Sequence, residues 1–267
     1  MTRPSARTAA ARPHAPLLAY VLHSHDWSET SLIVELFTRD RGRIVLAAKG
    51  AKRPTSNFRS LLLPFQPLHV VLGKTPVDEQ AEILTLRSAD WAGGRPLMPA
   101  SALLGGYYLN ELLLKLLARQ DAHPTLFDNY ADTVASLASG VDEAVALRAF
   151  ELMLLRELGV LPELSTATLS AEPVQTDARY TLQAEAGLVR SAQGLTGAQW
   201  VTLEAALSHG SAQAVQHACR PVAAALRVPL RETLHYHLGH LPLRTPQVRQ
   251  GVQKLANSAR ALPVATP

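Results

Sequence analysis

The chain has little cysteine, no long apolar run and few aromatic residues near its basic segment. Cys219 is the only cysteine among 267 residues, which excludes an internal disulfide and a zinc site made of several thiolates. Apolar runs such as Leu112–Leu114 are too short to cross a bilayer. Residues 1–15 are rich in Ala, Arg and Pro without an apolar core of the signal-peptide type. We therefore expect a disordered basic arm and a cytoplasmic protein.

Motifs of nucleotide-binding and hydrolytic enzymes are also missing. Gly73-Lys74-Thr75 matches the end of a phosphate-binding loop, but Leu68 stands where its first glycine is required. No G-x-S-x-G, H-E-x-x-H or G-x-G-x-x-G occurs. Three histidines lie close together, but on a helix the first two point roughly 200° apart; they are His235, His237 and His240. We expect no metal, no cofactor and no catalytic set, so the chain is not predicted to be an enzyme.

One stretch is nearly free of acids. Arg39–Arg59 carries seven Lys and Arg residues against Asp40 alone, a charge of +6 on a chain whose net charge is +4. Nucleic acid is the commonest partner of such a patch, because each neutralised phosphate releases counterions; a solvated Lys/Arg loop is the alternative. The candidate DNA-binding residues are Arg39, Arg41, Arg43, Lys49, Lys52, Arg53, Arg59 and Lys74, with Phe58 as the ring for base stacking.

The region around this patch reads as strands. Alternating or continuous apolar residues predict five strands, over residues 17–23, 29–38, 43–49, 66–73 and 81–87. Asp40-Arg41-Gly42 predicts a turn with a positive φ at Gly42, and Pro54 with several small polar residues predicts a loop over 50–60. Five short strands without intervening helices favour a small barrel over residues 16–90. Phe37 and Phe65 are expected to be core residues.

The rest of the chain reads as helices. Amphipathic periodicity predicts helices over 106–120, 125–139 and 141–159, with Gly159 as the last one's stop. Residues 161–195 predict a small irregular subdomain, after which helices return, one kinked at Pro221 and the last capped by Thr245 with Pro246 at its first position. The predicted fold class is multidomain α+β, with the helical domain built from 96–160 and 196–260.

Leucine is dense over 103–117 and 147–161. Two amphipathic helices need fewer apolar residues than this for one shared face, so part of this surface is expected to form an open apolar groove for a short peptide. The alternative is that the helices after residue 196 cover it.

Three segments in order resemble the RecO family of bacterial recombination mediators. The first, over 20–58, has an apolar strand, Glu29, a strand ending in Phe37-Thr38, a glycine turn and Ala48-Lys49-Gly50. The second is LNELLLKLL at 109–117, and the third is LRAFELMLLRELGVLPEL at 147–164. The similarity is good over residues 16–164 and loose over the last hundred.

The resemblance implies an oligonucleotide-binding (OB-fold) barrel followed by a helical domain. It implies binding to single- and double-stranded DNA, strand annealing, and action with RecR to load RecA onto DNA coated by single-stranded-DNA-binding protein during repair. It also implies a nucleoid-associated location. The C-terminal tail of the single-stranded-DNA-binding protein is a candidate occupant of the apolar groove, its acids meeting Lys115, Arg119 or Arg156.

The chain departs from the family at one place. Many members have two cysteine pairs that hold zinc after the segment matching Pro162-Glu163-Leu164, whereas Ser165–Ser191 contains no cysteine. A zinc site is therefore not expected, and this part must be held by packing and hydrogen bonds or be loose. A nuclease-like enzyme and a protein-interaction scaffold with an incidental basic loop are the alternative functions.

Overall fold

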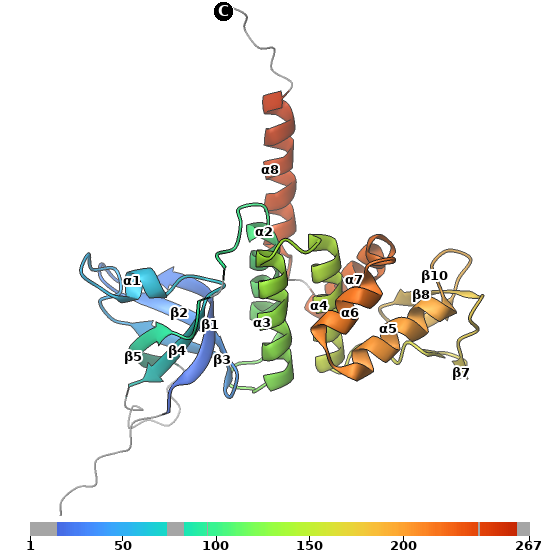
Figure 1. Cartoon of the computed structure of the whole chain (residues 1–267), viewed down its shortest axis with the longest axis horizontal. Coiled ribbons are helices and arrows are strands. Elements are labelled where there is room, and N and C mark those ends of the chain that lie inside the picture. Colours follow the sequence, from blue (N-terminus) through green and yellow to red (C-terminus); the bar gives the residue numbers. More distant parts are fainter. Residues whose placement is uncertain (1–14, 74–82, 95, 240, 261–267) are drawn as a thin grey trace, which may run out of the picture.

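A barrel, a group of helices and a small sheet lie in a row along the molecule, and the last helix projects from the middle (Figure 1). The computed structural model describes residues 15–73, 83–94, 96–239 and 241–260. The arm over 1–14 and Lys74 lie outside these ranges. Within them, no helix has the length and apolar character needed to span a membrane.

Five strands close the barrel, in the order β1-β2-β3-β5-β4. They are β1 (Leu17–Asp26), β2 (Leu32–Thr38), β3 (Gly42–Ala48), β4 (Pro67–Leu72) and β5 (Ile83–Trp91). All pairs are antiparallel except β3 with β5, which run parallel. A closed five-stranded barrel of this kind is the OB-fold architecture, so the predicted fold of this region is confirmed. Alternate aliphatic side chains such as Val34, Leu36 and Leu46 fill its interior.

The barrel is held to the helices by a buried polar contact. A bulge in β1 between Val21 and His23 interrupts the ladder with β2. The side-chain amide of Asn110 donates to the Leu22 carbonyl at 2.9 Å, and the Tyr130 hydroxyl donates to Asn110 Oδ1 at 2.7 Å. A buried carbonyl without a hydrogen-bond donor lowers stability. The Asn110 amide supplies a donor for the Leu22 carbonyl, which lies at the bulge. Tyr20 and the predicted core residue Phe37 pack around this contact on Phe127 and Tyr130.

The glycine turn after β2 also belongs to this junction. Gly42 has φ +62°, as predicted, and a Cβ there would lie 1.7 Å from the carbonyl oxygen of Asp121. Only glycine fits, because it avoids both the left-handed strain and the clash with backbone. The position fixes how closely the β2–β3 turn approaches the chain after the first long helix.

Eight helices surround or follow this junction in the described residues. After the single turn α1 (Phe58–Leu61) come α2 (Leu103–Leu116), α3 (Pro124–Ala138) and α4 (Glu143–Glu157), then α5 (Gly197–His209), α6 (Ala212–Cys219), α7 (Ala223–Leu238) and α8 (Arg244–Arg260). α4 is the centre, with ten consecutive or near-consecutive residues buried, because α3, α6 and α7 all pack against it. Gly159 has φ +70° beyond the end of α4, which fits the predicted stop.

This packing shows that the expected open apolar groove is wrong. The leucines over 147–161 are buried except half-buried Leu158, and those over 103–117 are buried or half-buried. α6 and α7 cover α4, and α8 lies against α2. The alternative, in which helices after residue 196 cover the leucines, is the one observed.

Two predicted helix details are also wrong. The last helix begins at Arg244 rather than after Thr245, and a distant acid caps it: the Glu111 carboxylate accepts from the backbone N–H groups of Arg244 and Thr245 at 2.7 and 2.8 Å. Pro221 does not kink a helix, because it lies in the break between α6 and α7, whereas Pro229 lies inside α7.

Residues 161–195 form short strands held by hydrogen bonds and packing. β8 (Arg179–Gln183) lies between β9 (Gly187–Arg190) and β10 (Leu195–Thr196), beside the ribbon of β6 (Thr166–Ala167) and β7 (Glu172–Pro173). The Leu188 N–H donates to Thr168 Oγ1 at 2.8 Å, and the buried Trp200 indole donates to the Tyr180 carbonyl at 3.0 Å. Residues 165–191 contain neither cysteine nor histidine, so this donor set does not fit the zinc that the resemblance implies.

Candidate nucleic-acid interface

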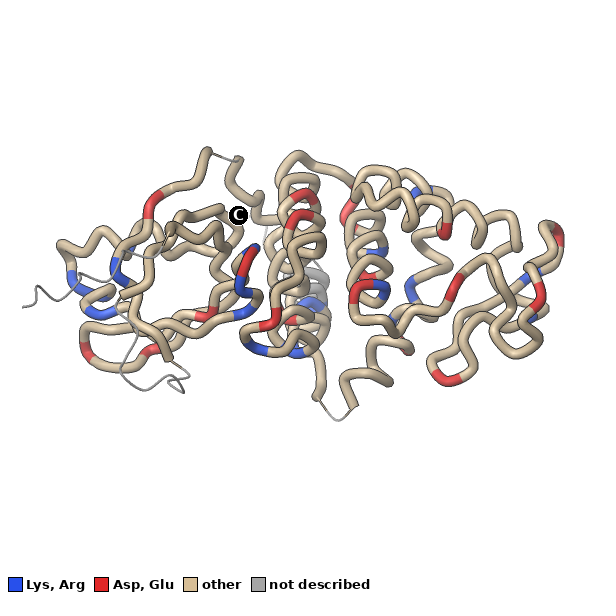
Figure 2. Tube along the Cα trace, turned by 90° about the horizontal axis from the view of Figure 1, so that it is seen from below, with Lys and Arg blue, Asp and Glu red and all other residues tan. Residues whose placement is uncertain are grey.

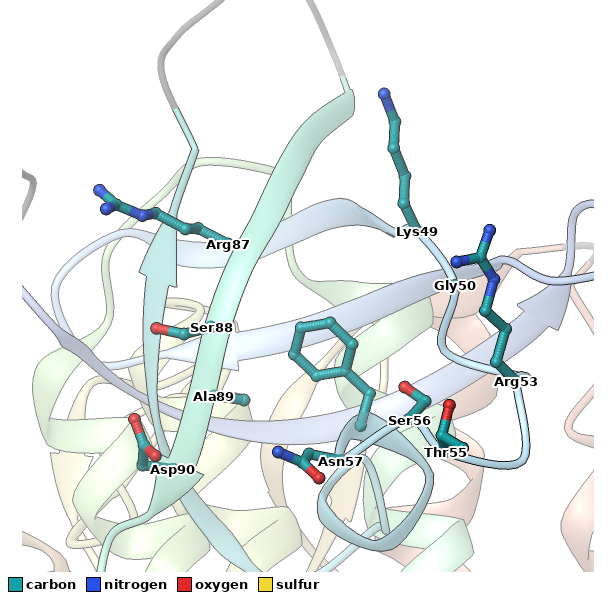
Figure 3. Close-up of a pocket in the computed structure, with 11 residues that line it drawn as sticks. Lys49, Gly50, Arg53, Thr55, Ser56, Asn57, Arg87, Ser88, Ala89 and Asp90 are labelled. Carbon is teal, nitrogen blue, oxygen red and sulfur yellow. The ribbon is translucent and has the colours of Figure 1, made fainter.

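A polar pocket of about 450 Å³ lies on the outer face of the barrel, between β5 and the segment that follows β3. Cations stand at one end and an acid at the other: Figure 3 shows Lys49, Arg53 and Arg87 at the upper end, and Asp90 further down β5. The hydroxyl and amide side chains of Thr55, Ser56 and Asn57 lie on the loop side of the pocket, opposite β5 (Figure 3). The lining residues are Lys49, Gly50, Arg53, Thr55, Ser56, Asn57, Phe58, Arg87, Ser88, Ala89 and Asp90.

The loop side of the pocket is a series of tight turns. Gly50 has φ +72°, and the N–H groups of Ala51, Arg53 and Ser56 each donate to the carbonyl three residues earlier. The predicted loop over 50–60 is therefore ordered by its own hydrogen bonds and ends in the helical turn α1, which the sequence analysis did not predict. Lys49 and Arg53 are exposed on this framework.

The strand side of the pocket brings in Arg87, which the sequence analysis missed. β3 and β5 run parallel with Ala47 opposite Thr85, so Lys49 and Arg87, each two residues further on, come to the same level of the barrel. Both side chains are exposed. Their proximity follows only from the strand order, because the two residues are 38 positions apart in the sequence.

The pocket offers the groups that a nucleic-acid strand needs. Three exposed cations can neutralise phosphates, and Ser, Thr and Asn side chains can donate to phosphate or sugar oxygens. Phe58 is half-buried at the pocket wall, packed on the barrel core through Leu61 and its neighbours. Part of its ring is therefore available for contact with a base.

The arginines at the start of the basic run are placed elsewhere, at the junction with the helices. Figure 2 shows Lys and Arg of the barrel in two groups, one at its outer rim and one beside the helices. Arg39 makes a bidentate contact with Asp128 of α3 at 2.8 and 3.0 Å, and the hydrogen bond to this carboxylate raises the pKa of Arg39. Arg43 donates to Glu35 at 2.6 Å and to the Leu117 carbonyl at 3.0 Å.

Lys52, Arg59 and Arg41 lie at three other places on the barrel, and Lys74 lies outside the residues that the structure describes. Lys52 is half-buried, and its ammonium lies 3.2 Å from Asp26 and 3.3 Å from the Ser28 carbonyl. Arg59 is exposed on α1 and Arg41 on the glycine turn. The structure therefore does not bring the predicted basic residues into one patch. It places Lys49 and Arg53 with Arg87, and Arg39 and Arg43 with acids.

The predicted partner-binding cations are also occupied within the chain. Lys115 pairs with Glu111 at 2.9 Å and donates to the Pro242 carbonyl. Arg156 makes a bidentate contact with Glu204 at 2.6 and 2.9 Å. Arg119 is exposed, and its backbone bridges to that of Arg43. Two of the three side chains thus fasten helices to neighbouring segments.

The histidines do not converge on a metal. Across the described residues, no group of three or more His, Cys, Asp or Glu side chains is placed to hold an ion; His240 lies outside them. On β1, His23 and His25 lie with ring centroids 4.2 Å apart. Partial burial and then the neighbouring His25 lower the pKa of His23.

Comparison with known proteins covers most of the chain. Residues 17–94 match the family model described as "Recombination protein O N terminal", and residues 100–247 match "Recombination protein O C terminal". The DNA repair protein RecO of Variovorax paradoxus (strain S110) is 50% identical over 258 residues, covering 91% of this chain and 97% of the relative. The DNA repair protein RecO of Polaromonas sp. (strain JS666 / ATCC BAA-500) is 50% identical over 244 residues, covering 89% and 96%. The chain therefore belongs to the RecO family of DNA repair proteins.

Proposed function

We propose that this protein binds single- and double-stranded DNA through the barrel pocket and anneals complementary strands as a non-catalytic mediator. The observation that carries the proposal is an open polar pocket on an OB-like barrel, lined by exposed Lys49 and Arg53 on its loop side and by exposed Arg87 on β5 (Figure 3). OB-fold proteins bind nucleic acid through a basic groove that follows the backbone. The family supports the assignment of DNA as the polyanion.

The proposal includes the partners of the pathway. Acting with RecR, the protein would load RecA onto single strands coated by single-stranded-DNA-binding protein, and this work would take place at the nucleoid. Neutralised phosphates explain how one molecule can hold two strands without sequence preference, because backbone contacts carry affinity but no sequence information. The covered leucines and the paired Lys115 and Arg156 remove support for a peptide groove on α2 and α4, so no docking site is proposed there.

Strand annealing in EDTA without nucleotide tests the proposal against a nuclease-like function. The wild-type protein should anneal complementary oligonucleotides under these conditions and leave their lengths unchanged, because neither metal nor hydrolysis is needed. The triple variant Lys49→Ala, Arg53→Ala, Arg87→Ala should anneal slowly and bind both strand types weakly. Annealing that requires a metal, or strand cleavage that appears when Mg²⁺ is restored, would contradict the mediator function.

A second triple variant with the same loss of charge shows whether slower annealing is specific to the pocket residues. Arg179, Arg190 and Arg231 are exposed cations remote from the barrel, on the small sheet and α7. Replacing these three with alanine removes the same formal charge from the chain. Annealing should stay close to wild type, and an equal loss would show that total charge rather than the pocket governs binding.

A further inference from the structure

The more exposed of the two exposed tryptophans on the barrel is not in the pocket. Trp27 lies in the turn between β1 and β2, and 56% of its surface is exposed. Phe58, the ring singled out from sequence, is half-buried instead. Leaving the apolar surface of a tryptophan in water is unfavourable, but a single exposed ring is not by itself evidence of a function. The residues around the ring indicate a function.

The turn of Trp27 is fastened to the loop that forms the pocket. The Lys52 N–H donates to the Thr30 carbonyl at 2.9 Å, and the Gly50 N–H donates to Ser31 Oγ at 3.3 Å. The Trp27 N–H donates to the Ser31 carbonyl at 3.2 Å and closes the turn itself. These contacts use backbone and Ser31, and none uses the indole. The ring is therefore carried on a fixed support that does not depend on it.

Charge beside the ring favours a base over a phosphate. The Lys52 ammonium contacts the residues on both sides of Trp27, the Asp26 carboxylate and the Ser28 carbonyl. Asp26 and Glu29 are exposed acids in the same turn, so a phosphate placed on the turn would meet two carboxylates against one ammonium. A neutral base meets no such repulsion, and every base has a π-face that can stack on an indole.

We propose that Trp27 is a base-stacking platform that extends the DNA site beyond the pocket and favours single strands. Phosphates would lie at Lys49, Arg53 and Arg87, and an unpaired base would lie on the Trp27 ring. A duplex keeps its bases stacked inside the helix, so it would gain nothing from this ring. The inference rests on the proposed DNA-binding function and adds to it the residue that distinguishes the two kinds of strand.

The test compares Trp27→Ala with Trp27→Phe on an oligo(dT) strand and on a duplex of equal length, by fluorescence anisotropy. Trp27→Ala should weaken single-strand binding by roughly 5- to 100-fold, the range for loss of one stacked base. Duplex binding and the log–log salt slope should stay at wild-type values, because the indole carries no charge. Trp27→Phe should keep most of the single-strand affinity.

A second measurement needs no loss of affinity. The chain has three tryptophans: Trp200 is buried, and Trp91 lies opposite Leu68 and level with Ala19, which is eight residues before Trp27 in the chain. Oligo(dT) should quench a larger fraction of the fluorescence in the Trp91→Phe variant than in wild type, because the unquenched emission of Trp91 is removed. It should leave the Trp27→Phe variant unquenched.

The possible outcomes distinguish failure of the stacking inference from failure of the proposed DNA-binding function. If wild type binds neither strand type, the DNA-binding proposal itself fails. If wild type binds oligo(dT) while Trp27→Ala binds equally well and quenching persists in Trp27→Phe, only the stacking platform is overturned. An equal loss for strand and duplex in Trp27→Ala would also overturn it, because the ring would then act on the fold of the site.

Discussion

The two ends of strand β3 carry similar cations with different surroundings. At its start, Arg43 is 13% exposed and pairs with Glu35, which is 14% exposed, while nearby Arg39 reaches across to Asp128 of α3. Just past its end, Lys49 and Arg53 stand exposed at an open pocket and are joined by Arg87. The first group holds the barrel to the helices, and the second is free to meet phosphates.

The charge of a segment therefore does not by itself identify a binding site. The run over 39–59 has a charge of +6. Within it, Lys49 and Arg53 are exposed to solvent at the pocket, whereas Arg39 and Arg43 pair with acids. A cation whose charge is matched by a neighbouring carboxylate adds little potential beyond about 10 Å. An exposed one is free to neutralise a phosphate and so to release the cations condensed on the DNA.

Gly42→Ala should cause the largest loss of stability. The new Cβ would meet the Asp121 carbonyl oxygen in a backbone conformation with φ +62°, so we expect a fall of about 3 kcal/mol or more in the free energy of unfolding. Urea unfolding measures it. Gly140→Ala is the control, because Gly140 also has a positive φ but open space around it, and should cost only about 1 kcal/mol. Equal costs would show that the barrel junction is not closely packed.

Arg43→Ala should destabilise the fold without changing how the folded protein binds DNA. It leaves the Glu35 carboxylate nearly buried and without its cation, which costs roughly 3 kcal/mol, at the low end for a buried pair because some solvent reaches both side chains. The double variant Arg43→Met, Glu35→Leu should recover much of this stability, since no charge is then left unpaired. A changed log–log salt slope for DNA in Arg43→Ala would instead assign Arg43 to the interface.

The Arg39–Asp128 contact should have the smallest effect. Both side chains are largely exposed, so solvent and salt screen their attraction. A double-mutant cycle with Arg39→Ala and Asp128→Ala should give a small favourable coupling that disappears at 1 M salt. A large coupling, unchanged by salt, would mean that this pair dominates the junction.

Much of the fold was predictable because local patterns and the final packing agree. The five strands follow from their apolar periodicity, the glycine turn from Asp40-Arg41-Gly42, and the helices over 103–157 from their spacing. The buried positions of Phe37 and Phe65 were also expected. The family resemblance, read from three short segments, added the order of the barrel and the helical part and is confirmed by the comparisons.

The site was less predictable because it depends on contacts between distant residues. Arg39 meets its acid 89 positions away, and no local rule identifies Asp128 as that acid. Arg87 joins Lys49 only through the parallel pairing of β3 with β5. Threonine is a common N-cap residue, which is why Thr245 was predicted to cap the last helix. The carboxylate of Glu111, 134 positions earlier, caps that helix instead. Leucine density left both an open groove and a covering layer of later helices possible, because a single sequence does not show which later helix packs on which face.

The most direct test compares two pairs of arginines of equal charge across a salt series. Arg53→Ala with Arg87→Ala should flatten the log–log salt dependence of single-strand binding by about 1.4, at ~0.7 per lost phosphate contact. Arg39→Ala with Arg41→Ala removes the same charge from the junction end and should leave the slope unchanged. Equal flattening in both pairs, or flattening only in the second, would contradict the assignment of DNA binding to the pocket.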